Sequence, residues 1–223
     1  MMSIAENLNR IKKDIPDGVK LVAVSKFHTK EDILEAYDAG QRVFGESRMQ
    51  ELVQKQKELP TDIEWHFIGN LQTKKVKAIV PYIDTIHSID SWKLLSEVDK
   101  HAAALNKRIN CLLEIHIAQE ENKIGFSFED CRRFLDDYQW QKCIFANITG
   151  IMAIASNTND QYLIRKEFKD LKKFFSELKN DYFYKDDSFS QISMGMSHDY
   201  QIALEEGSTM VRIGSSIFGE RVY

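Results

Sequence analysis

The 223-residue sequence has little of what marks secreted, membrane or nucleic-acid-binding proteins. It has only three cysteines, Cys111, Cys131 and Cys143; an odd number without metal-ligand spacing is typical of reduced thiols in a cytosolic protein. No apolar run is long enough to span a bilayer, and the polar start of the chain is unlike a signal peptide. The formal charge is −4 with no basic tract, so we expect no nucleic acid. We predict a cytoplasmic protein without a membrane partner.

Low-complexity segments and interior linkers are also absent, so the sequence offers no point at which to divide the chain. Hydrophobic residues make up 43% of it, and a chain of this length can bury a substantial core in one unit. We therefore expect a single domain, residues 1–223. No ligand spacing of histidines and carboxylates points to a metal site. No helix stands out as a partner surface, which favours a monomer.

The spacing of the apolar residues predicts a repeated strand–helix unit. Ile4, Leu8, Ile11 and Ile15 recur at helical spacing, so the chain opens with an amphipathic helix. Short apolar strands then alternate with helices, an order that implies a parallel sheet. We predict eight strands, at 21–24, 42–44, 64–68, 85–87, 111–117, 144–152, 191–193 and 210–213. Helices are expected between the strands. The first begins after a Thr29 cap, the third ends at residue 80 and the last ends at residue 206; the others are expected at 49–58, 91–105, 129–138 and 161–178.

Eight such repeats close naturally into a barrel. A (β/α)₈ TIM barrel has a usual size of roughly 250 residues, slightly above this chain. The alternative, an open doubly wound sheet, predicts a glycine-rich phosphate loop after the first strand. Here that strand ends in Lys26 with no glycine nearby. We therefore predict an α/β protein, a (β/α)₈ barrel with an extra N-terminal helix.

Two glycine–serine turns follow the last two predicted strands, within Ser193–Asp199 and Met210–Gly219. Each runs from an apolar strand through glycine to serine at an expected helix start. Glycine allows close approach of a ligand, and helix N-termini present N–H groups that bind phosphate. One such turn is as readily a helix cap, but two in succession after strands seven and eight predict one shared phosphate site. The candidate residues are Ser193, Gly195, Ser197, Gly214 and Ser215.

Lys26 ends the first predicted strand and is the candidate nucleophile. It shares the side-chain parity of Val22 and Val24 and lies at the end of the strand where barrel enzymes place catalytic residues. A lysine there can simply extend into solvent. Alternatively, its desolvated amine can form a Schiff base. A ligand that carries both an aldehyde and a phosphate is pyridoxal phosphate (PLP). A closed barrel would bring Lys26 next to the two turns.

Arg212 lies on the eighth strand with the parity of Met210 and Gly214. Arginine stays protonated and only donates hydrogen bonds. Facing a pyridine nitrogen, it would keep that nitrogen unprotonated, and the ring would be a weaker electron sink than one paired with a carboxylate. The alternative is an arginine paired with a buried acid.

The remaining polar residues give no pattern of a catalytic or metal site. Three histidines on predicted strands could line the barrel interior or its mouth: His66, His87 and His116. We interpret them as structural, or as supporting residues behind the site. Three tyrosines on helices or loops are interpreted as packing residues: Tyr82, Tyr162 and Tyr200. Glu46 follows the second strand and could reach the mouth; its role stays open.

Five motifs occur together over nearly the whole chain: Leu21-Val-Ala-Val-Ser-Lys26, Phe44-Gly-Glu46, Trp65-His-Phe-Ile-Gly69 with Leu71-Gln72, Ser193-Met-Gly-Met-Ser197, and Gly207-Ser-Thr-Met-Val-Arg-Ile-Gly214 with Ile217-Phe-Gly219. Together they resemble the pyridoxal phosphate homeostasis proteins. The resemblance implies a barrel of the alanine racemase N-terminal type (PLP fold type III), with PLP on Lys26. It also supports a ring-nitrogen role for Arg212.

The resemblance implies a protein that holds and supplies PLP without robust turnover, with no established catalytic residue. Apo-enzymes that use PLP would be its recipients. An amino-acid racemase is the enzymatic alternative, and a phosphate-sugar isomerase or aldolase is the alternative without PLP. The racemases it resembles take a second base from a tyrosine of a C-terminal β-domain. Because the sequence ends at Tyr223, directly after the eighth unit, we expect no such domain.

Two positions depart from the family pattern. Ser47 follows Gly-Glu where the family usually has asparagine, and Lys74 replaces the asparagine of the Leu-Gln-x-Asn-Lys stretch. A shorter or charged side chain there puts a polar contact to the cofactor ring in doubt. We assign neither residue to the site.

Overall fold

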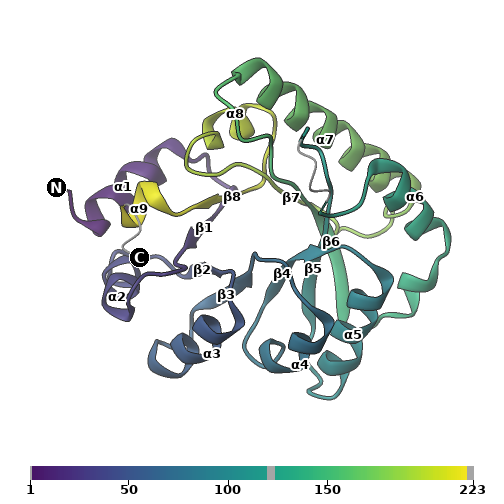
Figure 1. The fold of residues 1–223 in the computed structure, drawn as a ribbon, viewed down its shortest axis with the longest axis horizontal. Coiled ribbons are helices and arrows are strands. Elements are labelled where there is room, and N and C mark those ends of the chain that lie inside the picture. Colours follow the sequence, from purple (N-terminus) through teal and green to yellow (C-terminus); the bar gives the residue numbers. More distant parts are fainter. Residues whose placement is uncertain (1, 120–123, 220–223) are drawn as a thin grey trace.

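The strands close into an eight-stranded parallel barrel in strict sequence order (Figure 1). A computed structural model describes residues 2–119 and 124–219. Closure comes from β1 lying parallel to β8, with Lys20 opposite Met210 and Ala23 opposite Ile213. The strands are β1 (Lys20–Val24), β2 (Val43–Glu46), β3 (Glu64–Phe67), β4 (Thr85–Ile89), β5 (Ile109–Glu114), β6 (Ala146–Met152), β7 (Gln191–Ser193) and β8 (Met210–Ile213). The predicted barrel is confirmed.

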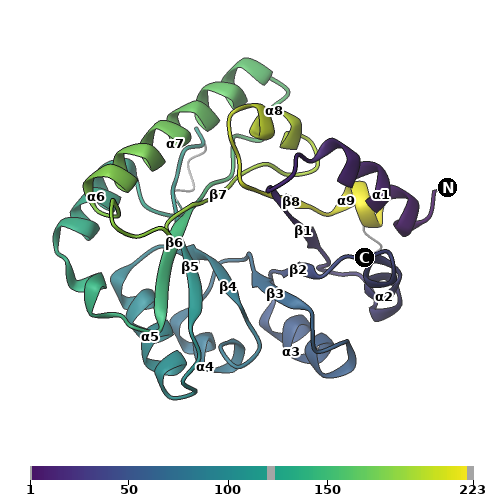
Figure 2. The same cartoon turned by 180° about the vertical axis from the view of Figure 1, so that it is seen from behind.

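Helices cover the outside of the barrel, as Figures 1 and 2 show from opposite sides. The α-helices are α1 (Ile4–Asp14), α2 (Lys30–Asp38), α3 (Met49–Glu58), α4 (Val76–Ile79), α5 (Trp92–Ala103), α6 (Phe128–Asp136), α7 (Gln161–Asp181), α8 (Tyr200–Glu205) and α9 (Ser215–Phe218); η1 (Thr73–Lys75) and η2 (Gln139–Lys142) are 3₁₀ turns. Thr29 caps α2 through a capping box with Asp32, as predicted. The extra helix α1 packs beside α9, where the Asn7 amide donates to the Ile217 carbonyl (3.1 Å).

Element boundaries shift where loops make their own hydrogen bonds. The fifth strand was predicted at 111–117, but β5 ends at Glu114, because Ile115 forms an isolated bridge to Phe126 and the chain leaves the barrel. His116 therefore lies beyond the strand. The helix expected to start at Ser197 is also wrong, since α8 begins at Tyr200. The lysine-rich helix after β3 is reduced to η1 and the single turn α4.

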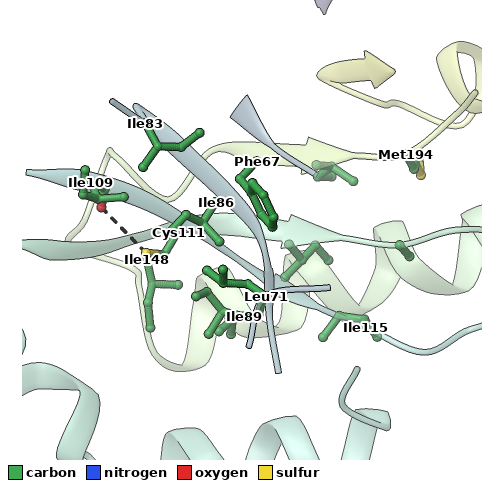
Figure 3. Packing of buried hydrophobic residues seen from close by; sticks show 14 of the residues in the cluster. Phe67, Leu71, Ile83, Ile86, Ile89, Ile109, Cys111, Ile115, Ile148 and Met194 are labelled. Carbon is green, nitrogen blue, oxygen red and sulfur yellow. Dashed lines mark hydrogen bonds between the residues drawn. The ribbon is translucent and has the colours of Figure 1, made fainter. Parts of the chain in front are cut away.

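The apolar core has one layer outside the strands and one inside the barrel. Figure 3 shows part of the outer layer, where Phe67, Ile86 and Cys111 pack with neighbouring apolar side chains. Each such side chain contributes about 1.5–3 kcal/mol when fully buried. The inner layer is crowded: a Cβ on Gly45 would meet Val22 Cγ1 at 2.9 Å. The inner layer therefore needs glycine at residue 45.

Several residues interpreted from sequence can now be placed. All three cysteines are free thiols, two of them buried, in agreement with the prediction. The packing role predicted for Tyr162 is wrong, because this tyrosine is 79% exposed. Tyr200 packs against the core, and its hydroxyl lies 3.0 Å from Asp14 Oδ2. Over the part of the chain that the structure describes, no helix has both the length and the apolar character needed to cross a membrane.

Candidate functional site

A cavity of about 240 Å³ opens at the carboxyl ends of β1 and β8. It is lined by five of the seven residues predicted for the site: Lys26, Ser197, Arg212, Gly214 and Ser215. The other lining residues are Val24, Ile68, Ile154, Met196 and His198. An apolar wall with a few convergent polar groups is typical of small-molecule sites. In such a barrel, this end is also where active sites lie.

The two glycine–serine turns meet at this cavity. Ser197 Oγ, from the loop after β7, accepts hydrogen bonds from the N–H groups of Gly214 (3.3 Å) and Ser216 (3.4 Å). The loop of one turn is therefore bonded to the backbone donors of the other. Hydroxyl and N–H groups directed to one place can surround a phosphate group.

Two predicted site residues lie behind the cavity instead of lining it. Ser193, the last residue of β7, is fully buried, and its hydroxyl lies 3.1 Å from His87 Nδ1. Gly195 has a φ of +95°, and a Cβ there would lie 2.6 Å from the Cβ of Ala203 on α8. Glycine is thus required for the turn and for the close packing of α8. Ser193 and Gly195 support the site from behind, and their direct contact with a ligand stays a prediction.

Arg212 is buried and held by three oxygen acceptors. Its Nη1 donates to Ser193 O (2.8 Å) and Ser193 Oγ (2.5 Å), and its Nη2 donates to Ala153 O (2.9 Å). Within residues 2–119 and 124–219, no carboxylate is hydrogen-bonded to it, so the alternative of an acid-paired arginine is wrong. Burial lowers the pKa of Arg212 to about 10, which leaves the guanidinium charged at neutral pH.

The residues on both sides of Lys26 are fixed by acids of β2 and α3. The Ser25 hydroxyl donates to Glu46 Oε1 (2.7 Å), and the Phe27 N–H donates to Glu51 Oε2 (2.8 Å). Phe27 has a φ of +69°, a strained conformation for a bulky residue that persists only when its surroundings hold it. Lys26 is half-buried between these two anchored residues, so its backbone position is well defined.

Lys55 completes this anchor, and sequence reasoning missed it. Its Nζ donates to Ser25 O (2.9 Å), Glu46 Oε1 (2.7 Å) and Glu51 Oε2 (3.2 Å). Burial raises the pKa of Glu46, and the nearby Lys55 opposes that rise. The open role of Glu46 is thereby answered: it holds the strand end that carries Lys26. The i,i+4 pair of Glu51 and Lys55 was the available signal, but such pairs are common on exposed helix faces.

The opposite side of the mouth carries acids. Glu114 ends β5 and lines a smaller cavity of about 130 Å³ together with His116 and Ile154; Ile154 also lines the larger cavity. Burial and the nearby Asp90 raise the pKa of Glu114 to about 7, against the opposing effect of Arg212. Sequence reasoning missed Glu114, because its place at the barrel mouth depends on where β5 ends.

The three histidines of the predicted strands, His66, His87 and His116, and the two positions that depart from the family pattern lie outside the larger cavity. His66 and His87 are buried inside the barrel and hydrogen-bonded, which supports their structural interpretation. Ser47 is half-buried, Lys74 is exposed on η1, and neither lines the cavity. No group of histidine, cysteine and acidic side chains among the described residues has a metal-binding arrangement.

Comparison with known proteins decides the family. The family profile described as "Alanine racemase, N-terminal domain" matches residues 1–222. A pyridoxal phosphate homeostasis protein from Schizosaccharomyces pombe is 40% identical over 229 residues, covering 99% of this chain and 94% of the relative. The chain belongs to the pyridoxal phosphate homeostasis protein family. The resemblance predicted from the motifs is confirmed.

Solved structures agree with this family assignment. PipY of Synechococcus elongatus, in a structure with PLP bound, has a TM-score of 0.88 and 35% identity, covering 97% of this chain and all of PipY. An alanine racemase of Clostridium difficile has a TM-score of 0.76 at 14% identity, covering 98% of this chain and 56% of the racemase. That similarity shows the shared barrel alone. Members of the homeostasis family thus have the fold that the sequence predicted.

Proposed function

We propose that this chain binds PLP as a Schiff base on Lys26 and takes part in PLP homeostasis without robust catalysis. The observation that carries the proposal is the convergence of Lys26, Arg212 and the two serine turns on one cavity. PLP bound to PipY and the names of the relatives support it. We further propose that residues 1–223 form one PLP-binding domain.

The donor set fits the chemical groups of PLP. A half-buried lysine amine suits the aldehyde, and the hydroxyls of Ser197 and Ser215, which line the cavity beside Gly214, suit the phosphate. Arg212 is a charged donor that suits an unprotonated ring nitrogen. PLP supplies electron-withdrawing chemistry when bound. The role of the protein is to orient it and to limit that chemistry.

The test is covalent trapping. The purified protein is mixed with PLP, reduced with borohydride and digested, and the peptides are examined by mass spectrometry. We expect one phosphopyridoxyl group, on the peptide that contains Lys26. A label on another lysine would refute the Lys26 assignment, and the absence of any label or new absorbance would refute PLP binding.

The racemase alternative rests on the shared barrel and the racemase family profile. Incubation with L-alanine in D₂O, followed by NMR of the Cα proton and chiral chromatography, separates the two functions. We expect little Cα–hydrogen exchange, because the arginine-paired ring stabilises a carbanion poorly. Turnover near or above about 1 per second, the range of ordinary enzymes, would establish the racemase instead.

We also propose that the protein acts in the cytoplasm as a monomer and that PLP-dependent apo-enzymes receive the cofactor. The free thiols Cys111, Cys131 and Cys143 support a reducing compartment. Sedimentation equilibrium should give the mass of one chain, 25.9 kDa. Transfer is tested by mixing the loaded protein with an apo-aminotransferase and measuring recovered aminotransferase activity against an equal amount of free PLP.

A further inference from the structure

A continuous chain of hydrogen bonds crosses the inside of the barrel, from the mouth to the opposite end. At the mouth, Arg212 Nη1 donates to Ser193 Oγ (2.5 Å), which lies 3.1 Å from His87 Nδ1. His87 Nε2 lies 2.9 Å from His66 Nδ1, and His66 Nε2 lies 2.9 Å from Glu64 Oε1. The four residues above Glu64 are at most 4% exposed. This polar chain therefore runs through the apolar interior of the barrel.

The two ends of the chain fix the direction of every hydrogen bond in it. Arginine can only donate, and an ionised carboxylate can only accept. Ser193, His87 and His66 stand between them. Each neutral imidazole offers one donor and one acceptor, and the Ser193 hydroxyl offers one donor and two lone pairs. Only one arrangement satisfies all of these groups: His66 and His87 each carry hydrogen on Nε2, and the Ser193 hydroxyl donates to His87 Nδ1.

The charges at both ends support that arrangement. The hydrogen bond from His66 and the Lys20 ammonium 2.6 Å away lower the pKa of Glu64, and burial opposes them. The resulting pKa is about 2. Glu64 is therefore ionised at neutral pH. Burial lowers the pKa values of His66 and His87, which keeps both rings uncharged there. The chain thus has a charged donor at the mouth, a charged acceptor at the far end and neutral groups between.

We propose that His87 is a positioning residue for Arg212, acting through Ser193. Because His87 Nδ1 accepts the hydrogen bond that the Ser193 hydroxyl donates, Ser193 Oγ presents a lone pair to Arg212. With the Ser193 and Ala153 carbonyls, it occupies three of the five guanidinium N–H groups. This grip fixes the guanidinium plane in the cavity wall. The functional part of the inference rests on the proposed role of Arg212 at the ring nitrogen of PLP.

The reverse arrangement would disturb the site. If His87 carried hydrogen on Nδ1, it would donate to Ser193 Oγ, which already accepts from Arg212 Nη1. The Ser193 hydroxyl proton would then lose its acceptor in a buried place, an unfavourable state for a polar group. Ser193 Oγ would then have to accept from both His87 and Arg212, one on each of its two lone pairs. The tautomer of His87 therefore sets how the Ser193 hydroxyl is oriented toward the guanidinium.

The first experiment measures the tautomers directly, without PLP. Long-range ¹H–¹⁵N NMR of the full chain at neutral pH distinguishes Nδ1–H, Nε2–H and doubly protonated imidazoles. We expect His66 and His87 both to be neutral with hydrogen on Nε2. Hydrogen on Nδ1 of either ring, or a charged ring, would overturn the proposed chain whatever the protein binds.

The second experiment links the chain to the site. His87→Leu should weaken PLP binding by about tenfold, the scale of one lost hydrogen bond to a charged group, and should shift the absorbance of bound PLP. Thr85→Val is the matched control: Thr85 is buried two residues earlier on the same strand, β4, and takes no part in the chain. It should stay within about twofold of the unmodified protein.

A pair of variants at the far end separates positioning from simple stability. Glu64→Gln keeps an oxygen acceptor for His66 Nε2–H, so the tautomers and the spectrum of bound PLP should be preserved. Glu64→Leu removes the acceptor and should alter both, although residue 64 lies at the opposite end of the barrel. If His87→Leu does not fold, this pair decides the question in its place.

The outcomes separate the two proposals. If His87→Leu and Glu64→Leu both match Thr85→Val in PLP affinity and spectrum, the positioning role is refuted, while trapping on Lys26 still supports PLP binding. If the unmodified protein binds no PLP, the proposed function fails, and the role of His87 at a PLP site fails with it. The tautomer measurement would then still test the hydrogen-bond chain itself.

Discussion

The two sides of the barrel mouth differ in whether their polar side chains have hydrogen-bond or ion-pair partners. On the β7–β8–β1 side, Arg212 is held by three acceptors, and the neighbours of Lys26 are anchored by the buried Glu46 and the half-buried Glu51. On the β5 side, no side chain within the described ranges forms an ion pair or hydrogen bond with the Glu114 carboxylate, and its pKa is raised to about 7. One side is preorganised to bind; the other carries an acid in a poor environment for its charge.

This difference separates the residues that affect ligand binding from those that affect folding stability. Anchored donors need little free energy of reorganisation when a ligand binds. An unpaired, largely buried carboxylate lowers the stability of the folded protein whenever it is ionised. Changes on the first side should therefore act on PLP binding, and changes on the second should act on folding.

The largest effect is expected at Lys26. Lys26→Ala removes the only amine that lines the cavity among the described residues, so the absorbance of the Schiff base should be lost completely. The folded state should survive, since Lys26 is half-buried at a strand end. Absorbance titration with PLP and circular dichroism measure the two effects. Lys30→Ala, on the surface at the start of α2, is the control. An unchanged absorbance band in Lys26→Ala would show that Lys26 does not form the Schiff base.

The second effect is expected at Arg212. Arg212→Gln removes charged donors from Ser193 Oγ and from the Ala153 carbonyl, whereas the Ser193 carbonyl keeps the Ala153 N–H (3.1 Å). This loss should lower the free energy of unfolding by about 1–3 kcal/mol. It should also change the spectrum of bound PLP. Urea unfolding and absorbance measure these effects. Arg165→Gln is the control, since the Arg165 guanidinium reaches solvent and its ion pairs with Glu205 and Glu206 should contribute little to stability. Equal loss of stability in both variants would show that the buried hydrogen bonds of Arg212 contribute no more than the ion pairs of Arg165.

The third effect concerns the serine turns. Ser197→Ala and Ser215→Ala should each weaken PLP binding roughly ten- to a hundredfold, the scale of one lost charge-assisted hydrogen bond. Binding of pyridoxal, which lacks the phosphate, should change little. Ser216→Ala is the matched control, because this neighbouring serine does not line the cavity. Calorimetry with both vitamers measures the effect. If PLP and pyridoxal bind equally well to the unmodified protein, the turns are only helix caps.

The smallest effect tests the acidic side. The Glu114 pKa rises from 4.5 in the unfolded chain to about 7 in the folded protein. Between these values the unfolded chain loses its proton first, so stability falls as pH rises. The penalty is fully present above pH 7, at most about 3 kcal/mol.

Glu114→Gln removes this penalty. The variant should be more stable than the unmodified protein at pH 8 by about 1–3 kcal/mol and equal to it at pH 4.5. Urea unfolding at the two pH values measures the difference. A stability gap that does not depend on pH would show that ionisation of Glu114 is not its cause. PLP affinity at pH 8 should change less than in the serine variants.

Much of the fold could be predicted because the signals are local. Apolar spacing indicated eight strand–helix units, and the Thr29–Asp32 capping box lies within one turn of chain. Errors arose where a tertiary contact decides the boundary. β5 stops at Glu114 because Ile115 bridges to Phe126, a pairing that no spacing rule reports in advance. The late start of α8 is an error of another kind: a local turn, in which Asp199 accepts from the Met196 N–H, lies where the helix start was expected.

The features of the candidate site also divide into those that short sequence segments determine and those that tertiary contacts determine. The sequence by itself determined that Lys26, Arg212 and two glycine–serine turns would stand at strand ends, because parity and turn chemistry are properties of short segments. Only the tertiary structure decided that Ser193 and Gly195 lie behind the cavity, that Lys55 and Glu46 anchor the neighbours of Lys26, and that His66 and His87 connect Arg212 to Glu64. Those relations join strands and helices far apart in the chain. The link from Arg212 to Glu64 follows from barrel closure, which packs side chains of different strands into one interior where buried polar groups need partners. The Lys55 anchor follows from the packing of α3 against the ends of β1 and β2.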